Sequence, residues 1–116
     1  MREFRCDFYI EWPGLISDLA LGISAALFPG MTFQPVSKYP EEDAILEKPV
    51  FGFEVRLDKS SGGKFCLELI REHEENIQYT DEEKIGQLQL AGYISSLLDA
   101  GGLKNTFKLL ENRIIK

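Results

Sequence analysis

The chain has 116 residues, of which 44% are hydrophobic and 28% are charged, and its formal net charge at pH 7 is −6. This length and composition fit one globular domain, residues 1–116, and exclude an intrinsically disordered chain. Nucleic-acid binding requires a basic surface, so the acidic excess argues against direct contact with a phosphate backbone. Cys6 and Cys66 lack the spacing of a disulfide framework or a zinc site, which favours a reducing cytoplasm.

Residues 3–12 alternate strictly between apolar and polar side chains, which predicts a half-buried strand with Cys6 on its core face. Residues 13–28 then repeat apolar side chains at helical spacing, until Pro29 and Gly30 end the helix. This segment is shorter than the roughly 20 residues that a membrane span needs, and it contains Asp18. We therefore expect a buried helix and no membrane span.

The second face of this helix is also poor in polar groups. Leu21, Ala25 and Phe28 lie there, opposite the main apolar stripe. An uncovered apolar patch tends to find a partner. We expect either a homodimer through Leu21 and Phe28 or coverage of this face by residues 31–48.

A β-hairpin follows in the middle of the chain. Residues 31–36 are expected to be extended and residues 39–49 to form a polar loop. Residues 51–58 and 64–70 then alternate on either side of a glycine-rich turn, so that Cys66 is expected on the more polar, accessible side of its strand. Thr80 and Glu83 form a capping box at the start of a second helix, and Gly101 and Gly102 end it.

Residues 103–116 fit either a helix or an edge strand. The order of elements is that of the ferredoxin-like βαββα(β) arrangement. The sequence thus predicts an α+β fold, with an antiparallel sheet and two helices packed on one face. Tyr9, Arg56 and Ile70 would project from the other face, where they could contact a partner or belong to an ordinary solvated face with pairs such as Arg56 and Glu68.

The most concentrated charge lies around the second helix start. It comprises Glu72, Glu74, Glu75, Asp81, Glu82 and Glu83, with the single histidine, His73, among them. These acids can stabilise a helix N-terminus and solvate a loop, or they can dock a basic partner. His73 has no second histidine with which to build a metal site, and no pattern of nucleophile and base or of a phosphate loop is present. We expect no catalytic residue, metal or cofactor.

In size, acidity and absence of catalytic motifs, the chain is similar to small acidic inhibitors such as bacterial immunity proteins and antitoxins. The resemblance includes no specific motif, so it transfers no residue roles. It implies a cytoplasmic protein that is not an enzyme and that neutralises a basic nuclease toxin by occupying its active-site cleft. Glu72, Glu74, Glu75 and Glu82 are the expected contacts. The alternative is a ferredoxin-like regulatory or small-ligand-binding domain that acts as an oligomer.

Overall fold

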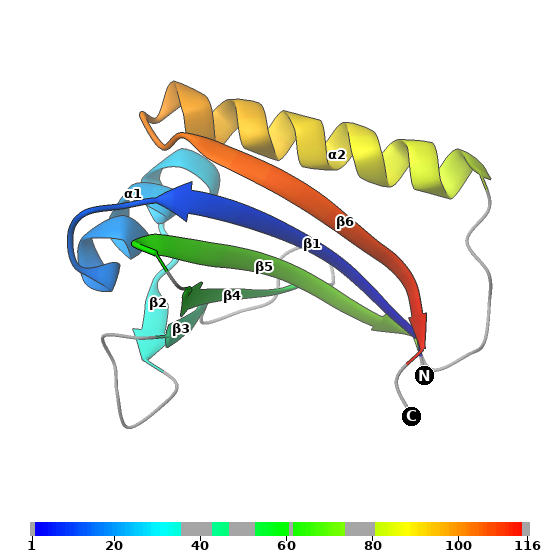
Figure 1. Ribbon diagram of the computed structural model, residues 1–116, viewed down its shortest axis with the longest axis horizontal. Helices are drawn as coiled ribbons and strands as arrows, with labels where there is room; N and C mark the ends of the chain where they lie inside the picture. The colour runs from blue at the N-terminus through cyan, green and yellow to red at the C-terminus, as the bar shows by residue number, and fades with distance from the viewer. Residues whose placement is uncertain (1, 36–42, 47–52, 61, 74–80, 115–116) are drawn as a thin grey trace.

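The computed structural model describes residues 2–35, 43–46, 53–60, 62–73 and 81–114 (Figure 1). The described strands form one antiparallel sheet in the order β2-β3-β4-β5-β1-β6. The elements in chain order are β1 (Arg2–Glu11), α1 (Ile16–Leu27), β2 (Phe33–Pro35), β3 (Asp43–Leu46), β4 (Glu54–Lys59), β5 (Lys64–His73), α2 (Asp81–Ala100) and β6 (Asn105–Ile114).

The predicted α+β class, with an antiparallel sheet and two helices, is confirmed. The order of elements differs from the predicted one, because β2 and β3 stand between α1 and the β4–β5 hairpin. The prediction of a polar loop over residues 39–49 is wrong at β3. There Asp43, Ala44 and Ile45 pair with β4, which places Ala44 opposite Leu57. The acidic residues and prolines around this short strand are typical of a loop, so the sequence pattern does not indicate a strand here.

The core lies between the two helices and one face of the sheet. Strand β1 lies between β5 and β6, and its Phe8 and Ile10 are fully buried. Leu19 and Ile23 of α1 pack against the same face of the sheet. The ambiguous C-terminal segment is a strand, whose Phe107 ring lies 5.8 Å from the Phe8 ring, centroid to centroid. The two-residue period of β6 thus brings alternate side chains onto the core.

Helix α2 is attached to the rest of the molecule through its C-terminal half. Leu98 is fully buried, and the amide of Leu103 donates to its carbonyl over 2.9 Å. Gly102 has a φ of 81°, a left-handed conformation that suits glycine in this helix stop. On β6, Asn105 accepts a hydrogen bond from the hydroxyl of Ser95 at 2.7 Å, which fixes the end of α2 against the strand.

The N-terminal half of α2 is different, because its large apolar side chains remain exposed. Ile85 is 57% exposed and Leu88 is 52% exposed. The apolar residues of α2 occupy more than one side of the helix. Leu88 and Leu90, two positions apart, point in widely different directions and cannot both face the sheet.

This difference between the two halves of α2 can be measured. We expect Leu98→Ala to lower the free energy of unfolding by about 3 kcal/mol, because it leaves a cavity in the core. Leu88→Ala, the matched change on the exposed half, should cost less than about 0.5 kcal/mol. Chemical denaturation of both variants compares them directly, and equal losses would mean that α2 packs along its whole length.

Candidate functional site

The sheet face opposite the helices carries a buried group of charged side chains. We call it the polar face; on β1, β4 and β5 it includes Arg5, Asp7, Tyr9, Glu54, Arg56, Asp58, Cys66, Glu68 and Ile70. The strand register places Glu68 of β5 between Arg56 of β4 and Asp7 of β1. No helix covers this face in Figure 1, yet Asp7 is only 2% exposed and Glu68 only 8%. Neighbouring side chains of the face therefore exclude water from its centre.

Arg5 holds this centre together. Its Nε donates to Asp7 Oδ1 at 2.7 Å, and its Nη2 lies 3.0 Å from Glu68 Oε1. One guanidinium thus contacts carboxyl groups on two adjacent strands, in the forked geometry that suits arginine. Arg56 lies opposite Glu68 in the register, as the sequence predicts, but the Nε of Arg56 is buried without a hydrogen-bond partner among the described residues.

Glu68 and Asp58 form a second interaction within the same group. Burial, a hydrogen bond with Asp58 and the negative charge of Asp58 together raise the pKa of Glu68 to about 8, against the opposing charge of Arg5. At neutral pH, protonated Glu68 can therefore donate to the Asp58 carboxylate. A carboxyl group with this behaviour is a common mark of a functional site, but ion-pair networks that only stabilise a fold produce it as well.

The raised pKa predicts that stability falls as pH rises from about 4.5 to about 8. Folding raises the pKa of Glu68 from an ordinary value of 4.5 to about 8, so its stabilising contribution is complete below pH 4.5 and is lost as pH rises to about 8. The slope in that interval is at most about 1.4 kcal/mol per pH unit. Urea unfolding from pH 5 to 9 should show this slope in the wild type and a flatter profile for Glu68→Gln.

The matched control is Glu54→Gln. Glu54 stands on the same sheet face but is exposed, so this variant should keep the pH dependence of the wild type. If Glu68→Gln and the wild type give parallel profiles, Glu68 does not titrate in this range.

The two cysteines lie on opposite faces of the sheet. Cys6 stands opposite Leu69 on the core face, and Cys66 stands between Asp58 and Tyr9 on the polar face. The prediction that Cys66 is accessible is wrong, because it is only 7% exposed, within the closely packed polar face. Both are free thiols, and burial raises the pKa of each to about 12. Neither has the thiolate character of a reactive cysteine.

This environment predicts slow thiol chemistry in the folded protein. We expect Cys6 and Cys66 to resist a disulfide reagent at pH 8 and to react fully, as two thiols, after denaturation without reductant. Reaction of the native protein with the exposed-position variant Glu54→Cys supplies the rapid reference rate. Rapid reaction of the native wild type would show that the polar face opens readily to solvent.

The structure locates only part of the predicted partner-binding set. Tyr9, Arg56 and Ile70 are partly exposed around the centre of the polar face, and burial, followed by the charge of Asp7, raises the pKa of Tyr9. Glu72 lies near the end of β5, and Glu82 lies in the first turn of α2. Glu74 and Glu75 fall outside the described residues. The predicted residues thus do not form one described cluster.

The strongest exposed feature is apolar, and it lies on α2. We call it the α2 surface; it consists of Ile85 and Leu88, which are 57% and 52% exposed. Leu90 and Tyr93 lie on another side of the helix and are 40% and 63% exposed. On α1, Leu21 is 68% exposed, whereas its predicted companion Phe28 is half-buried and packs against the core. Helical spacing alone did not reveal the α2 surface, because it does not distinguish exposed apolar positions of a helix from buried ones.

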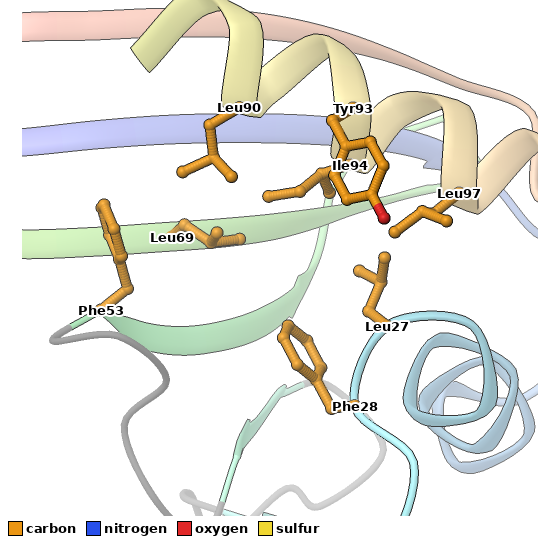
Figure 2. Close-up of a pocket in the computed structure, with 8 residues that line it drawn as sticks. All are labelled: Leu27, Phe28, Phe53, Leu69, Leu90, Tyr93, Ile94 and Leu97. Atoms are coloured by element: carbon orange, nitrogen blue, oxygen red, sulfur yellow. The ribbon is translucent and has the colours of Figure 1, made fainter. Parts of the chain in front are cut away.

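An apolar pocket of about 230 Å³ opens between α1, α2 and the sheet (Figure 2). Its floor is Leu69 of β5, and α2 forms one wall. Its lining residues are Leu27, Phe28, Phe53, Leu69, Leu90, Tyr93, Ile94 and Leu97. A concave apolar pocket of this kind can take an apolar group of a ligand.

The described residues contain no group of three or more histidine, cysteine or acidic side chains placed to hold a metal ion. Within the same residues, neither helix combines the length and apolar character that a membrane crossing requires. No family model, curated protein or solved structure matches this chain.

Proposed function

We propose that the protein binds a basic protein partner through the N-terminal half of α2. This proposal rests on the exposure of two neighbouring side chains. Ile85 and Leu88 are large and apolar, lie within one turn of each other, and are both more than half exposed. Exposed apolar side chains of this size are typical anchors of protein interfaces, where their burial supplies much of the binding energy.

The charge around this half of α2 defines the chemistry of the partner. The first turn of the helix contains Asp81, Glu82 and Glu83, which Lys84 separates from Ile85, and the whole chain carries a net charge of −6. Figure 1 shows that β5, with Glu72 near its end, finishes at the same end of the molecule where α2 begins. Acidic residues next to apolar anchors are complementary to a partner that has basic residues around an apolar depression. The opposite charges also speed association with such a partner.

The active-site cleft of a nuclease is a basic surface of this kind, because it has to hold a phosphate backbone. An acidic protein that enters the cleft competes with the nucleic acid for the same charges. The proposed activity is therefore inhibition of a basic nuclease toxin, in the manner of an immunity protein or antitoxin.

A second candidate is a regulatory domain of ferredoxin-like shape that acts as an oligomer. Strands β6, β1, β5 and β4 stand in consecutive order in the sheet, with β2 and β3 added beyond β4, and this supports the ferredoxin-like proposal. The exposed Leu21 on α1 supports self-association through that helix. Sedimentation of Leu21→Glu against the wild type tests this candidate without disturbing the half-buried Phe28.

The test of the partner proposal separates the charged from the apolar contribution. The partner to use is the product of the neighbouring reading frame, provided that it is basic and has nuclease activity. Replacing Glu72 and Glu82 by Gln should slow association by roughly threefold and weaken its salt dependence, because exposed charges act mainly on the encounter. Replacing Ile85 and Leu88 by Ser should instead speed dissociation by roughly tenfold or more, because these side chains would be buried in the complex.

The control variant is Glu11→Gln with Glu54→Gln, which removes the same charge from exposed positions elsewhere. Stopped-flow association at several salt concentrations, dissociation rates and a nuclease assay are the measurements. If the control slows association as much as the Glu72 and Glu82 variant, only the net charge matters. If none of the variants changes either rate, the α2 surface is not the interface.

A further inference from the structure

The apolar pocket differs from the α2 surface in being concave and built from several elements. In Figure 2 its side chains point toward a common space, with Leu27 and Phe28 from α1 at one end and Phe53, which precedes β4, at the other. Its lining is hydrocarbon and aromatic carbon except for the hydroxyl of Tyr93. Such a lining favours an apolar group and gives no compensation for a buried charge.

The pocket volume limits the size of this group. Its 230 Å³ exceeds the ~150 Å³ of an engineered apolar cavity that holds benzene. Scaling from the six carbons of benzene in that cavity gives room for roughly nine carbons. A straight alkyl chain of about eight carbons would therefore fill the pocket.

A positive charge stands beside the Phe53 end of the pocket. Arg71 follows Leu69 by two residues on β5, so the two side chains project from the same sheet face about 7 Å apart along the strand. The guanidinium carbon of Arg71 lies 5.9 Å from the centre of the Phe53 ring, and the residue is exposed. Among the described residues Arg71 forms no ion pair. Its donors can therefore meet an anion while Phe53 holds the side chain in place.

We propose that the pocket binds a medium-chain carboxylate, with its alkyl chain between α2 and the sheet and its carboxylate on Arg71. The two parts of the ligand correspond to separate observations, the apolar pocket and the exposed cation beside it. This site is independent of any protein partner, so the two proposals can fail separately.

Probes that differ in one property at a time test this assignment. Hexanoate, heptanoate and octanoate should bind with affinity rising about fourfold per added methylene, and the increase should stop beyond roughly nine carbons. Octanoate should bind more tightly than 1-octanol and octylammonium. The preference over octylammonium is diagnostic, because the net charge of −6 by itself would favour the cation. Methyl-resolved NMR titration of the leucine and isoleucine side chains measures each affinity and locates the contacts.

Variants of the protein complete the test. Arg71→Gln should weaken octanoate binding by about fivefold and leave 1-octanol binding unchanged, because only the carboxylate uses the guanidinium. Leu90→Trp should fill the pocket and abolish both. The matched control Leu88→Trp places the same ring on α2 outside the pocket lining and should bind as the wild type does.

Three results would overturn the proposal. The first is an absence of binding by both octanoate and 1-octanol to the wild type, which would mean that the pocket is closed in solution. The second is equal affinity for octanoate in the wild type and Arg71→Gln. The third is loss of binding in Leu88→Trp together with Leu90→Trp, which would place the probe on the α2 surface instead.

Discussion

Strand β1 is buried on both of its faces, and the other elements are arranged around this constraint. Phe8 is fully buried under the helices, and its neighbour Asp7, on the polar face, is only 2% exposed. A carboxylate so far from water is costly unless it is paired, and Arg5 supplies the pairing at 2.7 Å. Strand β1 thus needs an apolar layer on one side and a polar layer with paired charges on the other.

This double burial also fixes the register of the sheet. A register shift of one residue would point Asp7 and Arg5 toward the helices and Phe8 toward the polar face. Neither the apolar layer nor the polar layer would then keep its packing. The charged side chains of the polar face interact mainly with one another. Arg5 bridges Asp7 and Glu68, while Glu68 shares a hydrogen bond with Asp58. Their engagement favours the helix side of the molecule as the place for binding.

The sequence predicts those parts of the fold that depend on local periodicity. Alternation identified β1 and the β4–β5 hairpin and placed Cys6 and Cys66 on opposite faces. It did not reveal that Cys66 is buried, because packing on the polar face depends on side chains from three strands. It also missed β3, where pairing with β4 outweighs weak local signals. The apolar pocket could not be predicted, because it depends on the relative positions of α1, α2 and β5, which no single segment of the sequence determines.

The uneven attachment of α2 connects the fold to binding. Its C-terminal half is held by Leu98, the glycine stop and Asn105, whereas its N-terminal half buries few side chains of its own. Regions with few buried apolar contacts are the ones from which binding surfaces are drawn, because a ligand or partner can add contacts there that the folded chain lacks. Leu90 stands at the junction, since it lines the pocket and is 40% exposed. The exposed Ile85 and Leu88 and the pocket lined by Leu90 are therefore two separate places on the helix side of the molecule where contacts can be added.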